Sequence, residues 1–195
     1  MIPRELTLIV AATNKMGIGR ANTLPWIGLK KEMAYFARVT KRAPPDTINA
    51  VVMGRKSWES IPPKYRPLKD RMNVVITRNS RLTAEGSVVV GSVEGATEAT
   101  KRPEVNKTFI IGGAEIYKAA LERKEARRIL LTRVLSDFDC DAFFPLHLDE
   151  SRKIEGWERK SKEEHDRWVG EQVPEGVQEE NGTRYVFEMW EKTES

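Results

Sequence analysis

The sequence predicts an α/β fold with a predominantly parallel central sheet, flanked by helices on both faces and closed by a C-terminal antiparallel hairpin. Two observations lead to this prediction. Short runs rich in Val, Ile and Leu are continuously apolar rather than alternating, as in strands that are covered on both faces. Segments of helical character separate these runs, and such an alternation of strand and helix is typical of a parallel sheet.

Six apolar runs are the expected strands. They lie at Leu6–Ala12, Ala50–Met53, Asn73–Ile76, Val88–Val90, Phe109–Ile111 and Ile129–Thr132. Helices are expected between them, at Leu29–Thr40, Lys56–Ser60, Glu94–Thr100 and Ala114–Arg123. After Gly156 the pattern changes, and Trp157–Ser161 and Arg184–Lys192 are interpreted as two strands joined by a long charged loop. These two strands form the expected closing hairpin.

Composition limits the classes of function. With 195 residues, 39% of them hydrophobic, the chain can bury one sizeable core, so a single domain over residues 1–195 is expected. The net charge of +4 comes from Lys and Arg spread along the chain, which favours anionic ligands. A nucleic-acid-binding module would instead need clustered charge and exposed aromatic side chains, so no nucleic-acid partner is expected.

Cysteine and histidine usage points to a reducing compartment and away from metal chemistry. Cys140 is the only cysteine, which rules out an intrachain disulfide and suits a cytoplasmic location. His147 and His165 lie far apart in sequence without a cysteine pattern, so no metal site is expected. Met1–Leu6 contains an early Pro and Glu, unlike a secretory signal peptide, and no run approaches the ~20 apolar residues of a membrane span.

A carboxylate falls on the apolar side of the first helix. At about 3.6 residues per turn, Leu29, Met33, Phe36 and Thr40 lie along one stripe, and Glu32 falls within it. Burying an unpaired carboxylate is costly, so Glu32 needs a hydrogen-bonding partner, a raised pKa or a ligand. It is therefore a candidate functional group. The alternative is a side chain at the edge of the stripe or one paired with an internal Arg.

Two segments have a strand, glycine and helix arrangement that can bind phosphate. In Met53–Ser57 an apolar run leads into a helix, whose free N–H groups, with Lys56 and Ser57, can bind an anion. The same arrangement recurs in Ile110–Tyr117, where paired glycines allow a ligand to approach the backbone. Neither segment has a Walker or Rossmann pattern. A glycine with a purely structural role at a strand end explains either one equally well.

A third strand end strengthens the anion-binding interpretation. Thr77 and Arg78 follow the run that ends at Ile76, and together the three strand ends indicate a ligand with several phosphates. Arg55 and Arg78 are suited to bind a 2′-phosphate, which would select NADP over NAD.

A series of short motifs along the chain adds to these observations. They are Ile9–Ala12, Met16–Gly19, Leu24–Trp26, Glu32 with Phe36, Met53–Trp58, Ser60–Pro62, Arg66–Leu68, Arg71, Ile111–Gly113, Tyr117, Leu131–Arg133 and Asp141–Pro145. In this order they resemble the dihydrofolate reductase family over nearly the whole chain, and its eukaryotic members more closely than the shorter bacterial ones. The resemblance implies an NADPH-dependent enzyme that reduces dihydrofolate to tetrahydrofolate by hydride transfer to pterin C6 and protonation at N5. It also implies folate-analogue inhibitors as ligands, and we expect a monomer.

For the substrate, the resemblance implies that Glu32 binds the amino group and ring N–H of the pterin, supported by Thr132. Trp26 would hold a water near Glu32. Arg71 would bind the α-carboxylate of the glutamate tail through its planar fork. The other substrate contacts implied are those of Ile9, Ala11, Leu24, Met33, Phe36, Ile61, Leu68, Ile111 and Tyr117.

For the cofactor, the resemblance implies that Ala11 and Ile18 border the nicotinamide, beneath a lid formed by Met16–Trp26. The phosphates and the adenosine end would contact Gly54, Arg55, Lys56, Ser57, Ile76, Thr77, Arg78, Gly112, Gly113, Ala114, Glu115 and Ile116. Three departures stand out: Gly91 and Ser92 replace an arginine of vertebrate relatives, Met33 occupies a position often held by Phe, and the charged stretch 161–182 has no assignable role. A reductase acting on a pyrimidine precursor of riboflavin would share the cofactor features, but it would not need Glu32, Phe36 and Arg71 together.

Overall fold

The computed structural model describes residues 4–194, which divide into two compact units. Unit 1 contains residues 4–8 and Thr40–Ala126, and unit 2 contains Ile9–Val39 and the chain from Arg127 onward. Strand β1 (Leu6–Thr13) contributes its first residues to unit 1 and the others to unit 2. Residues 1–3, part of the segment compared above with signal peptides, lie outside the described residues.

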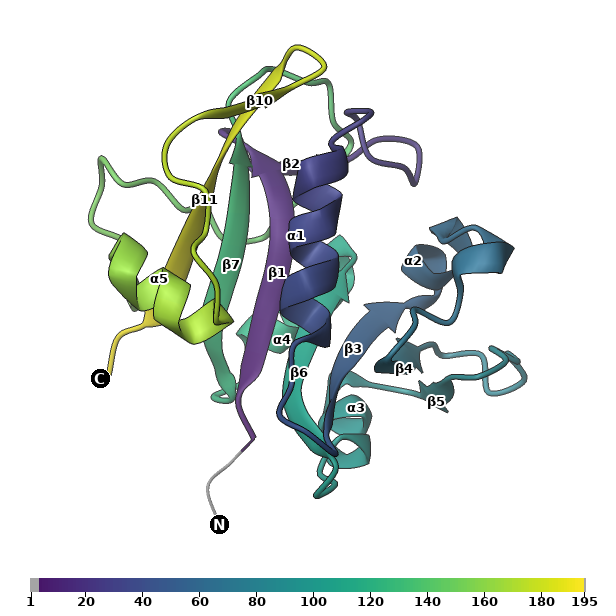
Figure 1. Cartoon of the computed structure of the whole chain (residues 1–195). Coiled ribbons are helices and arrows are strands. Elements are labelled where there is room, and N and C mark those ends of the chain that lie inside the picture. The colour runs from purple at the N-terminus through teal and green to yellow at the C-terminus, as the bar shows by residue number, and fades with distance from the viewer. Residues whose placement is uncertain (1–3, 195) are drawn as a thin grey trace. The chain divides into compact units, whose positions relative to one another are not determined.

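Unit 1 is built on parallel strands. The start of β1 is followed in the sheet by β6 (Val105–Gly112), β3 (Ile48–Gly54), β4 (Arg71–Ile76) and β5 (Val88–Val90), and all the adjacent pairs are parallel. Figure 1 shows β3, β4 and β5 side by side. The central residues of β3 are fully buried, which explains why this strand reads as a continuous apolar run.

Helices follow the strands of unit 1. They are α2 (Arg55–Ser60), α3 (Val93–Ala99) and α4 (Ala114–Leu121), with a 3-10 turn at Pro63–Tyr65. The start of α3 is fixed by Ser92, whose side chain accepts a hydrogen bond from the N–H of Gly95. Helix α4 begins after Gly113, which has no side chain with which to cap it.

Unit 2 contains the antiparallel strands. Strand β11 (Thr183–Lys192) pairs with β7 (Ala126–Val134), β9 (Trp157–Arg159) and β10 (Gln178–Glu180). A separate small sheet joins β2 (Gly17–Gly19) to β8 (Ala142–Phe143). Helix α1 (Lys30–Lys41) packs on β11, because the rings of Tyr35 and Phe187 lie 4.3 Å apart. Helix α5 (Lys162–Val169) also lies against β11, as Figure 1 shows.

The predicted strands and helices are confirmed with small differences at their ends, and so is the predominantly parallel α/β class. The closing antiparallel pair is confirmed as β9 with β11. The prediction of a long charged loop between these two strands was wrong, because this stretch contains α5 and β10. A capping box of Ser161 and Glu164 begins α5, and Asn181 and Gly182, both with positive φ, form the turn between β10 and β11.

Across residues 4–194, no helix combines the length and apolarity that crossing a membrane requires.

Candidate functional site

Glu32 lies among residues of unit 2 that form a hydrogen bond with it and bury its carboxyl group. It lies in the first turn of α1, and its Oε1 accepts a hydrogen bond from Oγ1 of Thr132 on β7 at 3.0 Å. Burial raises the pKa of Glu32 to about 7; the hydrogen bond from Thr132 opposes this rise and the nearby carboxylate of Glu180 adds to it. A carboxyl with such a pKa can both bind and release a proton near neutral pH.

The buried face of α1 differs from the predicted stripe. Tyr35, Val39 and Thr40 are buried, whereas Met33 is 59% exposed and Phe36 is half-buried. The expectation that Met33 is buried along one stripe with Leu29, Phe36 and Thr40 was wrong, because the helix packs on β11 through Tyr35. The apolar side chain of Met33 is therefore left accessible.

Trp26 is fixed by packing near the start of α1. It is 4% exposed and forms a cluster with Leu29, Val134 and Tyr185. Ala11 of β1 packs against this cluster. The indole thus belongs to the same packed group as the residues that anchor the first turn of α1.

The other predicted residues of unit 2 differ in exposure. Ile9 is buried in β1, Ala11 and Ile18 are half-buried, and Leu24 is 54% exposed. Strand β2, which falls within the predicted lid, pairs with β8 through Gly17 and Phe143. Part of the predicted lid is therefore held in a small sheet.

Arg71 lies at the start of β4 in unit 1. Its Nη1 donates a hydrogen bond to Oγ1 of Thr40 at 3.0 Å, and its Nε donates to the carbonyl of Lys69 at 2.9 Å. Partial burial lowers the pKa of Arg71 from its usual value. Two donors of the guanidinium are thus held by the protein itself, which fixes its orientation.

Residues on either side of Arg71 are also held in place. The side chain of Asn73 accepts a hydrogen bond from the N–H of Leu68 and donates one to its carbonyl, each at 2.9 Å. Leu68, Ile61 and Ile111 are half-buried, and Tyr117 is buried on α4. Unit 1 therefore contains Arg71 together with four of the other predicted substrate contacts.

The predicted cofactor segments meet at one edge of the unit 1 sheet. Gly54 aligns with Ile76, Ile76 aligns with Val90, and Met53 aligns with Gly112. These strands are parallel, so their carboxyl ends lie at the same edge. Ligands of α/β proteins commonly bind at this edge.

Two glycines and a serine form a cradle at this edge. A Cβ added at Gly112 or Gly113 would lie 3.5 or 3.7 Å from Oγ of Ser57. Gly112 has a φ of 129°, which side chains rarely adopt. The Ser57 hydroxyl therefore faces the start of α4 across the place that a side chain would fill. This arrangement fits a phosphate group, which binds at helix N-termini and to hydroxyl groups.

The two arginines proposed for a 2′-phosphate are exposed. Nη1 of Arg55 forms an ion pair with Oε1 of Glu59 at 3.2 Å within α2. Arg78 follows β4, and Ser92 lies beyond the neighbouring strand β5 as the cap of α3. An anion bound by Arg55 would thus compete with Glu59.

Comparison with known proteins decides between the families considered above. The family model described as dihydrofolate reductase matches residues 5–191. This chain belongs to the dihydrofolate reductase family. The match therefore excludes the alternative interpretation of the sequence as a reductase that acts on a pyrimidine precursor of riboflavin. The family uses a nicotinamide cofactor in an oxidoreductase reaction.

Individual members of the family are similar over almost their full length. A dihydrofolate reductase from Pneumocystis carinii is 44% identical over 199 residues, covering 96% of each chain. One from Sus scrofa is 38% identical and covers 97% of this chain and 98% of the relative. The solved structure of Schistosoma mansoni dihydrofolate reductase has a TM-score of 0.80 at 34% identity, covering 97% of this chain and 99% of that one.

Two residues near Glu32 were not predicted from the sequence: Glu180, which accepts a hydrogen bond from the N–H of Glu32, and Tyr185, whose hydroxyl donates a hydrogen bond to Glu180. Both lie on the β10–β11 hairpin, in or beside the stretch left without a role. The Asn181-Gly182 pair was the available signal, because this dipeptide favours a two-residue hairpin turn.

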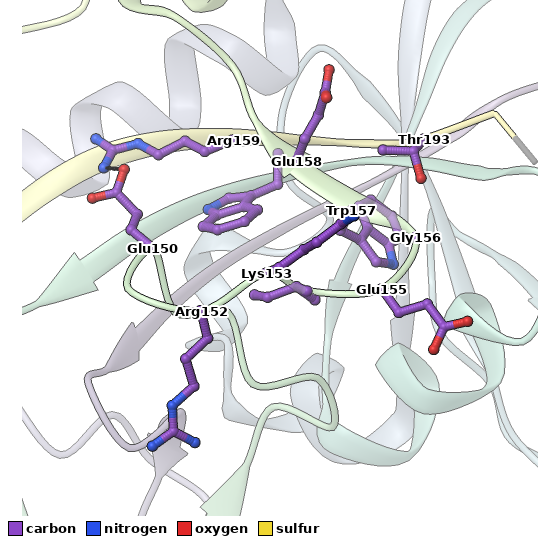
Figure 2. Close-up of a pocket in the computed structure, with 11 residues that line it drawn as sticks. Glu150, Arg152, Lys153, Glu155, Gly156, Trp157, Glu158, Arg159 and Thr193 are labelled. Atoms are coloured by element: carbon purple, nitrogen blue, oxygen red, sulfur yellow. Dashed lines mark ion pairs between the residues drawn. The ribbon is translucent and has the colours of Figure 1, made fainter.

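A separate pocket lies in unit 2, with a volume of about 520 Å³. Residues 150 and 152–159 line it together with Trp190 and Thr193, and none of them is a predicted site residue of this family member. Figure 2 shows acidic and basic side chains mixed around it, with Glu150 and Arg159 joined as an ion pair. The pocket is thus distinct from the residues that carry the predicted chemistry.

Proposed function

We propose that this chain reduces dihydrofolate to tetrahydrofolate with NADPH as the hydride donor. The observation that carries the proposal is the Glu32 carboxyl, held by Thr132 and with a pKa of about 7, in a member of this family. A carboxylate is the natural partner for the adjacent amino group and ring N–H of a pterin, since it accepts two hydrogen bonds side by side. Carbonyl groups of Ile9 and Ile111 would complete this edge.

The apolar side chains suit the rings of the substrate. Met33 and Leu24 are accessible and Phe36 is half-buried, and these side chains, with Ile61 and Leu68, offer apolar contacts to the rings. We assign Tyr117 to the same group. Arg71, oriented by its bonds to Thr40 and Lys69, would bind the α-carboxylate of the glutamate tail with its remaining donors.

The reaction adds a hydride to C6 and a proton to N5 of the pterin, and bound NADPH supplies the hydride. Glu32 would bind the far edge of the ring and need not touch N5. It would favour the protonated pterin, and an ordered water held near Trp26 would transfer the proton. A pKa of about 7 suits this task, because catalytic acids and bases work best when their pKa is close to the working pH.

NADPH is proposed over NADH because of Arg55 and Arg78, whose guanidinium groups can bind the 2′-phosphate. Lys56, Ser57 and the start of α4 would contact the pyrophosphate in the glycine cradle. The strand-end residues Gly54, Ile76 and Thr77 and the α4 residues Ala114, Glu115 and Ile116 would complete the contacts with the phosphates and the adenosine. Ala11 and Ile18 would border the nicotinamide.

We further propose that both units act as one domain, because the family match spans both of them. From the same assignment we propose that the protein is a monomer and that it binds folate-analogue inhibitors. A cytoplasmic location suits the single cysteine, Cys140, which is a free thiol.

Following the absorbance of NADPH after addition of dihydrofolate to the purified protein tests this function. Consumption of NADPH that depends on dihydrofolate, and is slower with NADH, is the expected result. Consumption with an aminopyrimidine substrate but not with dihydrofolate would contradict the proposal, and so would consumption without any substrate added.

A further inference from the structure

A carboxylate from the hairpin between β10 and β11 caps the helix that contains Glu32. The Oε1 and Oε2 atoms of Glu180 accept hydrogen bonds from the N–H of Lys31, at 3.0 and 3.1 Å, and Oε1 also accepts from the N–H of Glu32, at 3.2 Å. The residue before α1 is Leu29, which has no side-chain acceptor for this purpose. Glu180, 149 residues away from Lys31 in sequence, supplies that acceptor.

Tyr185 holds the capping carboxylate. Its hydroxyl donates a hydrogen bond to Oε1 of Glu180 at 2.5 Å, and its ring is buried beside Trp26 and Leu29. Burial, followed by the hydrogen bond to Glu180 and by the charge of Glu180, raises the pKa of Tyr185, so the hydroxyl stays protonated and remains a donor. Burial alone would raise the pKa of Glu180, but the bonds from Tyr185 and from the N–H groups of α1 lower it overall. Glu180 is therefore a fixed negative charge at neutral pH.

A second contact fixes the hairpin to the residues before α1. The side-chain N–H of Asn181 donates a hydrogen bond to the carbonyl of Gly28 at 2.8 Å. A Cβ added at Gly28 would lie only 2.1 Å from that nitrogen, so the two segments fit closely. Glu180 and Asn181 together join the turn to the start of the helix at two adjacent points.

We propose that Glu180, held by Tyr185, is a positioning residue for Glu32: it fixes the first turn of α1 and places a negative charge beside the Glu32 carboxyl. The inference rests on the proposed function, because it assigns Glu32 a role in turnover. It gives a task to part of the charged stretch 161–182, for which the sequence indicated none.

The groups that face Glu32 come from four elements. Thr132 of β7 donates to it, Glu180 of β10 repels its ionised form, and Tyr35 of α1 and Tyr185 of β11 interact with its charge. Burial raises the pKa of both tyrosines, so neither adds a negative charge. Lys31 is exposed on α1, and its positive charge acts on Glu180. Glu180 is thus the group that favours the protonated form of Glu32 by charge.

The substitution Glu180→Gln distinguishes the effect of the negative charge of Glu180 from the effect of its hydrogen bonds to the start of α1. The amide keeps an oxygen that can accept from the N–H groups of α1 but removes the negative charge. The pKa of Glu32 should fall toward its ordinary value, by about half a pH unit or more. The limb of the kcat/KM profile that depends on protonated Glu32 should then move to lower pH by the same amount, while rates at the acidic end stay close to those of the parent.

Two further variants control for structural effects. Glu179→Gln removes the same charge from an exposed neighbour on β10 and should leave the pH profile unchanged. Tyr185→Phe keeps the packed ring but removes one of the hydrogen bonds that hold the Glu180 carboxylate in place, and it should shift the profile in the same direction by a smaller amount. The latter variant keeps the inference testable if Glu180→Gln folds poorly.

A titration of the unliganded protein with carboxyl-labelled glutamate, followed by carbon NMR, gives a readout that is independent of turnover. The resonance lost in Glu32→Gln identifies Glu32, and its midpoint should be lower in Glu180→Gln than in the parent. Equal midpoints, or a rate loss that is uniform across pH, would overturn the positioning role by charge. If Glu32→Gln itself keeps full activity, the proposed role of Glu32 falls and the positioning role with it. If Glu32→Gln is inactive and the midpoints are equal, only the positioning role falls.

Discussion

Replacing Glu32 by Gln should cripple turnover at neutral pH and leave the fold intact. The amide is nearly isosteric with the carboxyl and can still accept the hydrogen bond from Thr132, which lies 3.0 Å from Oε1. It cannot favour a protonated pterin. A general acid–base contribution is typically worth ~10²–10⁴-fold, so kcat/KM for dihydrofolate should fall by roughly that factor. Lower pH should restore part of the rate, because solvent then protonates the substrate.

The same replacement has a calculable effect on stability. Because burial raises the pKa of Glu32 from 4.5 to about 7, the folded protein holds a proton that the unfolded chain releases. The stabilisation from the protonated form is fully present below about 4.5 and is lost as pH rises through about 7. The parent should lose roughly 2–3 kcal/mol of unfolding free energy from this group between about pH 5 and about pH 8. The Gln variant cannot show this loss.

Urea denaturation at the two pH values measures this difference, with the variant as the control for all other ionisable groups. Rates across pH with saturating NADPH give the kinetic half of the test. A variant that stays within a few fold of the parent rate at neutral pH, and shows the same pH dependence of stability, would refute the reasoning. Glu32 would then be a side chain at the edge of the helix without a catalytic task.

Three further substitutions test the other assignments. Replacing Arg55 and Arg78 together by Ala should weaken NADPH binding, measured by fluorescence titration, far more than NADH binding, since each charged hydrogen bond is worth ~1.5–3 kcal/mol; equal losses would make both residues general electrostatic contributors. Arg71→Leu should raise KM for dihydrofolate with a smaller change in kcat, and a similar loss with a tailless dihydropterin would point to a structural role. Gly113→Ala places a Cβ 3.7 Å from Oγ of Ser57, an ordinary contact distance, so the methyl group fills the cradle without a clash and should weaken the binding of NADPH and NADH about equally with little change in Tm; unaltered affinity would remove the cradle from the cofactor site.

Local patterns in the sequence were enough to predict most of the fold. Continuous apolar runs predicted the strands at Ala50–Met53 and Phe109–Ile111. Strands of a parallel sheet are buried on both faces, so each residue of these runs is apolar and the run is visible in the sequence. Helix α5 and strand β10 were missed because their residues are mostly charged. Their capping box and Asn181-Gly182 turn are short signals within a stretch that resembles a surface loop.

A residue of the candidate site was predictable from local pattern only where its polarity differs from that of the residues around it in the sequence. Glu32 stood out because a carboxylate fell among apolar helix positions. Glu180 did not, because its role depends on hydrogen bonds to residues 148 and 149 positions away, and no periodicity within the β10 segment reports such contacts. The exposure of Met33 was likewise decided by which side of α1 packs on the sheet, and this choice depends on Tyr35 and its contact with Phe187.

The destination of the hydride tests the proposed reaction most directly. Dihydrofolate would be incubated with the purified protein and NADPH that carries deuterium at both C4 positions of the nicotinamide, and the product would be analysed by mass spectrometry and proton NMR. We predict tetrahydrofolate with one deuterium at C6 and a solvent-derived proton at N5. Tetrahydrofolate without deuterium at C6, or no reduction of dihydrofolate at all, would contradict the assignment.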